Sequence, residues 1–431
     1  MKVNNKLFNW KSWDQGSYPE LEPHSEAKLN VLQDYVTDYI KILCSQSFGQ
    51  DHFRITLVDG FSGGGIYNNG KLGSPFVLIK AVEIAEAALN TDGRNKPISV
   101  DCDYHFIDEN KKAIECLRYQ FEASGYKDRL NKSVFIHHGS FEEKNHDVVD
   151  RLKKRHPKGG ARVIFFLDQC GYTKVDPELI RSISQKLDNK AEFIINYAIE
   201  WLADFSGNNE QFRKRFITMN LGSELSVEEL IKIKETGGFH WKYLVEAKIG
   251  PAFKKISGSP FFSPFYIEPI DGHRGYWLLH LAPHERARSA MMDVHWKHAN
   301  SHRHFGHTGL DMLAFKGDAD QTGYMQGMNF NALTLESMKT KLADDFSRTI
   351  RDSHAKGVTF EKFSKSVSND TMATRTMKGE VIQFLASEGD VIITGPKGSH
   401  KRSEKINEGD IILPCYEKQL IFASCKIPSK K

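Results

Sequence analysis

Short apolar runs alternate with stretches of helical periodicity over the first half of the chain. The runs and the loops that follow them lie at 54–60, 101–110, 133–143, 161–172 and 191–202. Each run is nearly continuous in apolar residues, which is typical of a strand buried on both faces. The stretches between them repeat apolar residues every three or four positions, as amphipathic helices do. This alternation predicts a parallel sheet with helices on both faces.

The pattern divides the whole chain into three parts. Residues 1–50 predict a helical N-terminal extension, and 51–325 an α/β domain with a helical insertion at about 205–255. Two apolar runs near 265–283, separated by a DGHRG turn, predict an antiparallel edge to the sheet. The residue pattern changes at about residue 330, after which predicted helices precede two predicted strands around a basic Gly-Pro loop. That order predicts a winged-helix-like domain at 330–431.

Composition narrows the class of protein only slightly. The 431 residues are 40% hydrophobic and carry a net charge of +4, which suits a globular protein and does not by itself indicate nucleic acid. Six cysteines form no CxxC pair, so neither a disulfide framework nor a zinc knuckle is expected. No run reaches membrane-spanning length, and the first residues lack the apolar core of a signal peptide. We therefore expect a cytoplasmic protein.

The residues that could bind a ligand or take part in catalysis fall where the predicted strands end. They are the glycine loop after 54–60, the acids Asp108 and Glu109, the pair Gly139 and Ser140, and the segment 168–172. Ligands of parallel α/β sheets bind at the carboxyl ends of the strands. This co-location is a stronger signal than any one motif.

The glycine loop reads VDGFSGGG and fits the pattern D-x-F-x-G-x-G. It resembles the nucleotide-cofactor loop of S-adenosylmethionine-dependent methyltransferases, where small residues let the backbone approach the cofactor. An acid at the end of the next strand, Asp108 or Glu109, is then expected to accept hydrogen bonds from ribose hydroxyls. The alternative is a structural turn without a ligand. The expected cofactor-binding residues are Asp59, Phe61, Ser62, Gly63, Gly65, Asp108, Glu109 and Gly139.

The segment Asp168-Gln169-Cys170-Gly171-Tyr172 ends the fourth strand. At this place amino-methyltransferases carry an acid or amide, prolines and an aromatic residue. By that resemblance Asp168 orients an acceptor amine and Tyr172 stacks on a base, and these are the expected catalytic residues. The intervening residues depart from the pattern, and the alternative is a loop capped by Asp168. Cys170 also stands where cytosine-5 methyltransferases have a nucleophile, but a small buried cysteine is the commoner case.

Two further groups carry possible chemistry. A histidine cluster runs from His295 to His307 and predicts either a metal-dependent nuclease centre, a nucleic-acid groove or solvated side chains, without a recognised ligand spacing. The basic loop GPKGSHKR brings Lys397, Lys401 and Arg402 together, and phosphate contact is its functional interpretation. A solvated hairpin is the alternative.

The order of these segments resembles the three-Cys-motif partner (TcmP) family over most of the chain. The segments are PHSEAKLNVLQDY, VDGFSGGG, GSPFVLIKA, FIDEN, FFLDQCGY, MMDVHW with HFGHTGLDML, and the winged-helix-like tail. The resemblance implies a class I methyltransferase core of Rossmann-like type, a bacterial cytoplasmic setting and a radical-type partner protein that carries the three cysteines. This chain has no such three-cysteine motif.

The leading hypothesis is S-adenosylmethionine-dependent methyl transfer to DNA or RNA, in phage-defence or mobile-element biology. One alternative is a non-catalytic partner or regulatory module for the radical-type protein, favoured by the missing prolines after Asp168. A second is a metal-dependent nuclease that uses the cluster from His295 to His307. No metal is expected in the leading hypothesis.

Overall fold

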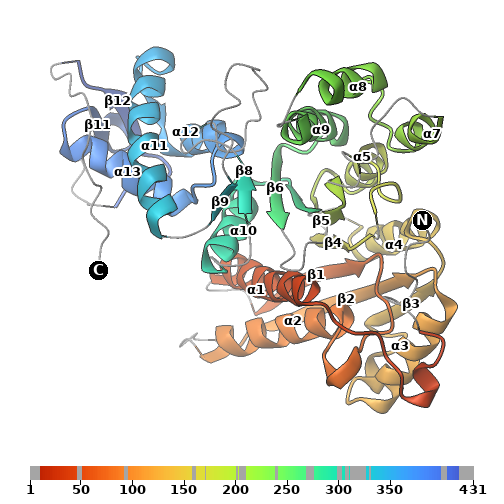
Figure 1. The fold of residues 1–431 in the computed structure, drawn as a ribbon. Coiled ribbons are helices and arrows are strands. Elements are labelled where there is room, and N and C mark those ends of the chain that lie inside the picture. The colour runs from red at the N-terminus through yellow and green to blue at the C-terminus, as the bar shows by residue number, and fades with distance from the viewer. Residues whose placement is uncertain are drawn as a thin grey trace. The chain divides into compact units, whose positions relative to one another are not determined.

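Figure 1 shows the chain as a computed structural model, which divides into two compact units, residues 1–283 and 284–431. Each unit is described by itself. The described residues are 10–45, 51–91, 96–157, 162–169, 171–199, 202, 210–237, 241–267, 276–298, 303–305, 310, 327–329, 332–398 and 405–416. No helix in these ranges has the length and apolar character needed to cross a membrane.

The first unit is organised around seven strands in the order β3-β2-β1-β4-β5-β7-β6. Strands β1 to β5 run parallel, and β7 pairs antiparallel with both β5 and β6. This order is that of the Rossmann-like methyltransferase fold, which confirms the fold class predicted for this part of the chain. The strands are β1 (His52–Asp59), β2 (Ser99–Asp108), β3 (Val134–His138), β4 (Val163–Leu167), β5 (Ala191–Tyr197), β6 (Phe261–Ile267) and β7 (Tyr276–Ala282).

Helices alternate with the first five strands, as the periodicity predicted (Figure 1). Asn110, Ser140 and Asp176 cap α3, α4 and α5 by accepting hydrogen bonds from the first backbone N–H groups of each helix, so each helix starts directly after a strand or its loop. The helices are α1 (Pro23–Ser45), α2 (Ser74–Thr91), α3 (Lys111–Ala123), α4 (Phe141–Arg155), α5 (Pro177–Lys186), α7 (Glu210–Thr218), α8 (Val227–Thr236) and α9 (Trp241–Ser257).

The central strands are buried along nearly their whole length. All five residues of β4 are at most 2% exposed, and Leu57, Val58 and Phe106 of the neighbouring strands are fully buried. Burial on both faces explains why these strands read as continuous apolar runs instead of alternating ones. The polar groups of the first unit therefore concentrate at the strand ends.

The second unit begins with α10 (Glu285–Lys297) and the short strands β8 (Arg303–Phe305) and β9 (Gly327–Asn329). A long helix, a short strand and two helices follow, and then two strands. Strands β10, β12 and β11 form an antiparallel sheet in that order. Its identification as a winged helix stays a prediction. The elements are α11 (Ala332–Ser353), β10 (Val358–Thr359), α12 (Phe360–Val367), α13 (Arg375–Ser387), β11 (Val391–Thr394) and β12 (Ile411–Pro414).

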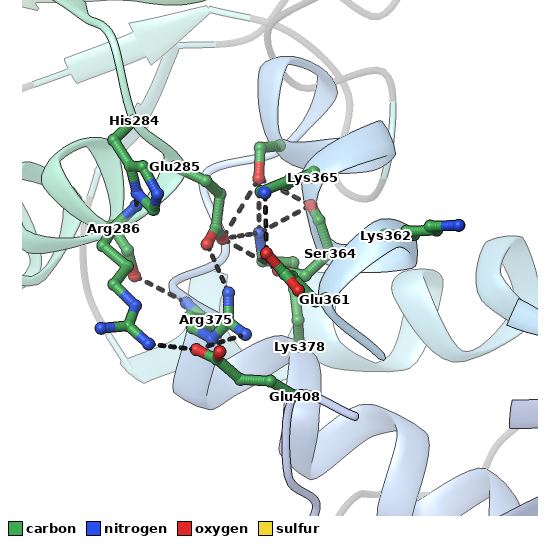
Figure 2. A network of polar contacts seen from close by, with 12 residues as sticks. His284, Glu285, Arg286, Glu361, Lys362, Ser364, Lys365, Arg375, Lys378 and Glu408 are labelled. Carbon is green, nitrogen blue, oxygen red and sulfur yellow. Dashed lines mark hydrogen bonds and ion pairs between the residues drawn. The ribbon is translucent and has the colours of Figure 1, made fainter. Parts of the chain in front are cut away.

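A buried ionic network fastens α10 to α12 and α13 (Figure 2). The carboxylate of Glu285 accepts hydrogen bonds from Lys378 Nζ at 2.9 Å, Arg375 Nη1 at 2.6 Å and Ser364 Oγ at 2.8 Å. Glu285 and Lys378 are each 1% exposed. Burial alone raises the pKa of the Glu285 carboxyl, but the positive charges of Lys378 and Arg375 outweigh it and lower that pKa to about 2. The first turn of α10 is thus held by charge as well as by packing.

Candidate functional site

The loops that follow β1, β2 and β3 are tied together by backbone hydrogen bonds. Gly60 N donates to Phe166 O at 2.9 Å, Ser62 N donates to Ile107 O at 3.0 Å, and Gly139 N donates to Asp108 O at 3.0 Å. These bonds extend the hydrogen bonding of the sheet beyond the ends of its strands. They bring the expected cofactor-binding residues from Asp59 to Gly139 to one edge of the first unit, as the sequence predicted from the strand ends.

The glycines of the loop are required by neighbouring protein side chains. Gly63 and Gly65 adopt φ of +59° and +78°, a backbone region that side chains disfavour. A Cβ atom on Gly64 would lie 2.3 Å from the ring of Trp10, and one on Gly65 would lie 2.6 Å from Leu117. Trp10 is 3% exposed and seals the outer side of the loop. The sequence analysis did not find this role, because nothing in an N-terminal aromatic residue indicates which loop it will cover.

Asp59 is the most perturbed acid at this edge. It ends β1, it is fully buried, and its Oδ1 accepts a hydrogen bond from Phe61 N at 3.1 Å. Its Oδ2 has no partner at hydrogen-bonding geometry among the described residues, although Ser74 lies close enough to lower the pKa. Burial, with smaller contributions from the charges of Asp168 and Asp108, raises the pKa of Asp59 to about 7. A buried carboxylate with a spare oxygen is a receptor for a cation.

Asp108 and Glu109 differ in their surroundings. Asp108 Oδ2 accepts from Gly63 N at 2.8 Å, and Oδ1 accepts from Asn110 N at 2.7 Å. Burial raises the pKa of Asp108 in spite of these bonds. Each oxygen can still accept a second donor, since a carboxylate offers about four acceptor positions. Glu109 is exposed and forms an ion pair with Lys174, so Asp108 is the better placed of the two expected ribose acceptors.

Asp168 lies in an ionic cluster that the sequence analysis did not anticipate. Lys28 Nζ, from α1, lies 2.7 Å from both carboxylate oxygens, and Asn196 Nδ2, near the end of β5, lies 2.7 Å from Oδ1. Lys28 is 5% exposed while Asp168 is 28% exposed, so the pair presents the carboxylate and not the ammonium group to solvent. Lysine in an amphipathic helix is normally read as a surface residue, which is why the periodicity of α1 gave no signal for Lys28.

Two aromatic residues, Tyr172 and Tyr67, have buried hydroxyl groups near this edge of the sheet. The Tyr172 ring is 6% exposed, its centroid lies 6.3 Å from that of Tyr197, and its hydroxyl has no partner among the described residues. The stacking role of Tyr172 stays a prediction. Tyr67 interacts electrostatically with the acids: burial, and then the negative charges of Asp168, Asp59 and Asp108, raise the pKa of its hydroxyl. Tyr67 is therefore a site residue that the sequence analysis missed.

Several predicted residues lie wholly or partly outside the described residues. These are Cys170, His302, His307, Lys401 and Arg402, while His304 and Lys397 are described only in their backbones. His295 and His298 lie at the end of α10, and His295 is fully buried. In the described ranges, no three side chains from histidine, cysteine, aspartate and glutamate are placed to hold a metal ion.

The described residues fit the polar groups of S-adenosylmethionine. Its amino-acid part carries an ammonium group, for which the unpartnered oxygen of Asp59 is a receptor. Its ribose carries two hydroxyl donors, for which Asp108 has free acceptor capacity at the end of the adjacent strand. The backbone of the glycine loop lies between these two acids, because Gly63 N bonds Asp108 and Phe61 N bonds Asp59.

Comparison with known proteins gives weak likenesses only. No family model matches the chain, and neither does any curated protein. The solved structure of the Legionella pneumophila protein LPL1258 matches 59% of this chain and 86% of its own length, at 11% identity and a TM-score of 0.31. A SAM-dependent methyltransferase from Agrobacterium tumefaciens matches 59% of this chain and 61% of its own length, at 9% identity and a TM-score of 0.29. A loganic acid methyltransferase with SAH matches 63% of this chain and 82% of its own length, at 10% identity and a TM-score of 0.24. The fold assignment therefore rests on the strand order of this chain, and membership of the TcmP family stays a prediction.

Proposed function

We propose that the protein binds S-adenosylmethionine at the carboxyl ends of β1 and β2 and transfers its methyl group to a nucleic acid. The observation that supports this most directly is the pair of acids on neighbouring strands, Asp59 with an unpartnered buried oxygen and Asp108 with spare acceptor capacity. Both belong to a sheet with the methyltransferase strand order. A buried carboxyl oxygen without a partner at hydrogen-bonding geometry destabilises the fold and calls for a compensating role.

The cofactor, when bound, supplies a methyl group on a positively charged sulfur. Asp59 binds the ammonium group, and Asp108 binds the ribose hydroxyls. Asp168 receives the acceptor, because its carboxylate is partly exposed at the adjacent strand end and Lys28 bonds both of its oxygens. Alignment of donor and acceptor accounts for most of the rate in a direct displacement, and a rigid ion pair provides such alignment.

The nucleic-acid part of the proposal depends on the second unit. Arg375 and Lys378 are the basic residues of α13, and both point inward to Glu285, as Figure 2 shows. Helix α13 therefore offers no basic side chain of its own for phosphate. We assign phosphate contact to the loop between β11 and β12, whose sequence carries Lys397, Lys401 and Arg402. The phage-defence or mobile-element setting follows only from the TcmP resemblance.

Titration calorimetry with S-adenosylmethionine and S-adenosylhomocysteine tests the cofactor site first. We expect micromolar binding that is at least about tenfold weaker in Asp59→Asn and is kept in Glu122→Gln, an exposed acid on α3. Transfer of labelled methyl groups to total RNA and to DNA then tests the acceptor class. A folded chain that binds neither compound would overturn the proposal.

The same experiment addresses the regulatory alternative. Asp168 Oδ1 already has two donors, from Lys28 and Asn196, which leaves less capacity for an acceptor than a free carboxylate would have. A chain that binds the cofactor tightly but transfers no methyl group would favour a partner or regulatory module for a radical-type protein. Co-purification of such a partner would be the next measurement.

A further inference from the structure

The amino ends of the parallel strands carry the opposite charge from the candidate site. An exposed basic residue lies within three residues of the start of each strand from β1 to β5. In strand order these are Arg54, Lys96, Lys132, Arg162 and Lys190. The carboxyl ends of β1, β2 and β4 carry the acids Asp59, Asp108 and Asp168 instead. The charge of the first unit is thus polarised along its strands.

The register of the sheet places neighbouring bases next to one another. Val163 and Ala191 are paired first residues of β4 and β5, so Arg162 and Lys190, which directly precede them, stand side by side. The backbone oxygen of Arg162 also accepts a hydrogen bond from Thr56 N of β1 at 2.9 Å. Neighbouring strands lie about 4.8 Å apart. The bases at the strand starts therefore form a row across the sheet.

The last turn of α4 adds positive charge to this row. It consists of Lys153, Lys154 and Arg155. Arg155 Nη2 lies 2.5 Å from Asp101 Oδ1, and Arg54 Nε lies 3.0 Å from Asp101 Oδ2, so two guanidinium groups share one carboxylate. That carboxylate holds both groups in place, and the guanidinium of Arg54 keeps further N–H donors for a ligand. Together with the five bases, this turn makes up what we call the amino edge.

The amino edge has an excess of positive charge. Lys154, Arg162 and Lys190 form no ion pair with any residue that the structure describes. The acids that reach the surface within three residues of the same strand starts are fewer than the bases, and are Asp51, Asp101 and Asp188. The excess acts on His156, which ends α4: burial, and then the positive charges of Arg155, Arg54 and Arg162, lower the pKa of its imidazole.

We propose that the amino edge binds the phosphate backbone of a nucleic acid. Phosphates follow one another every ~3.4 Å along a strand of a duplex, which is of the same order as the spacing of the bases in the row. Lysine and arginine contact phosphate oxygens without reading the sequence. A membrane surface fits less well, because no exposed large apolar residue described in the first unit lies on the amino edge; those residues are Leu72, Ile84, Tyr119 and Ile217.

This surface is separate from the candidate site and from the loop between β11 and β12. The acids at the carboxyl ends of the strands repel a polyanion, so they supply no affinity for a nucleic-acid backbone. The amino edge supplies that affinity from the other end of the same sheet. Binding of a backbone needs no cofactor, so the inference does not depend on methyl transfer.

Fluorescence anisotropy of a labelled single strand of about 30 nucleotides tests the amino edge in the full chain, without cofactor. The edge variant combines Lys154→Gln, Arg162→Gln and Lys190→Gln. We expect its Kd for the strand to rise at least about tenfold. The slope of log K against log salt should become about two units shallower, because each lost phosphate contact on a single strand removes about 0.7.

A matched control loses the same charge elsewhere on the first unit. It combines Lys80→Gln, Lys232→Gln and Lys248→Gln, which are exposed lysines on α2, α8 and α9. We expect its Kd to stay within about twofold of the wild type, since these lysines make no phosphate contact. Both variants keep the loop between β11 and β12, so any binding by that loop is common to both.

The outcomes separate this inference from the proposed function. Equal Kd values and salt slopes for the two triple variants overturn the inference, and so does a wild-type chain that does not bind the strand. Tighter binding to phosphatidylserine vesicles than to the strand also overturns it. A chain that binds the strand through the amino edge but does not bind S-adenosylmethionine overturns the proposed function alone. If circular dichroism shows the edge variant to be unfolded, Lys154→Gln with Lys190→Gln replaces it, with a slope about one unit shallower.

Discussion

The substitution Asp59→Asn should stabilise the free protein. Burial raises the pKa of Asp59 from 3.8 to about 7, so the folded chain holds a proton that the unfolded chain has released between these pH values. Stability therefore falls as pH rises through this window, and the full cost is present above pH 7. At 1.36 kcal/mol for each pH unit the cost is about 4 kcal/mol. Asparagine is neutral and nearly isosteric, and we expect it to recover about 1–4 kcal/mol at pH 8.

The same substitution should weaken cofactor binding. Asp59 must be ionised to pair with an ammonium group, and a carboxyl with a pKa of about 7 is ionised in about a tenth of molecules at pH 6 and nine tenths at pH 8. The affinity of the wild-type chain should thus rise about tenfold from pH 6 to pH 8. Asp59→Asn should bind at least about tenfold more weakly at pH 8, and its affinity should lose this pH dependence.

Two measurements on one protein preparation check both effects. Urea unfolding at pH 5 and pH 8 gives the free energy of unfolding, and calorimetry at the same pH values gives the Kd. Glu122→Gln serves as the control, since it removes an exposed acid from α3. If Asp59→Asn were less stable than the wild type at pH 8, or bound the cofactor as well, the burial and charge argument for this acid would be wrong.

Three other changes test separate parts of the structure. Gly64→Ala should cost about 1–3 kcal/mol in urea unfolding, since its Cβ would lie 2.3 Å from the Trp10 ring, whereas Gly125→Ala has open space and should be near neutral. Glu285→Gln should cost about 3–5 kcal/mol, because it leaves the ammonium group of Lys378 buried without its counter-charge; equal stability would contradict the assigned network. Burial lowers the pKa of His105 to about 3, so the unfolded chain binds the proton first and stability should fall by up to about 5 kcal/mol from pH 6.5 to pH 3. His105→Phe should make the free energy of unfolding less dependent on pH in this range. An unchanged slope would contradict the role assigned to His105.

The sequence predicted the sheet and placed the candidate site at the carboxyl ends of its strands. Strand burial on both faces leaves a continuous apolar pattern, and the acids Asp59, Asp108 and Asp168 interrupt that pattern at the strand ends. The position of an acid along one strand is a local property, which is why these three could be placed in advance. The fold then brings their strands side by side in the order β2-β1-β4.

The contacts of Asp168 could not be found in the same way. Lys28 is 140 residues away in sequence and reaches Asp168 only because α1 packs against the sheet. Asn196 reads as the last polar residue of an apolar strand and carries no motif. Side-chain partners between distant segments depend on the packing of whole elements, and a single sequence contains no pattern that reports it.

The packing of Trp10 against the glycine loop changes what the glycine signature means. Gly64 must lack a side chain because the indole of Trp10 occupies that space. A Cβ atom on Gly60 would likewise collide with Leu167, and one on Gly65 with Leu117. Selection for a stable fold would therefore keep these glycines even in a descendant that had lost its ligand. Asp59 behaves in the opposite manner, because its buried charge destabilises the empty protein. Among related chains, the retention of this acid would distinguish those that still use a cofactor from those that keep only the shape of the loop.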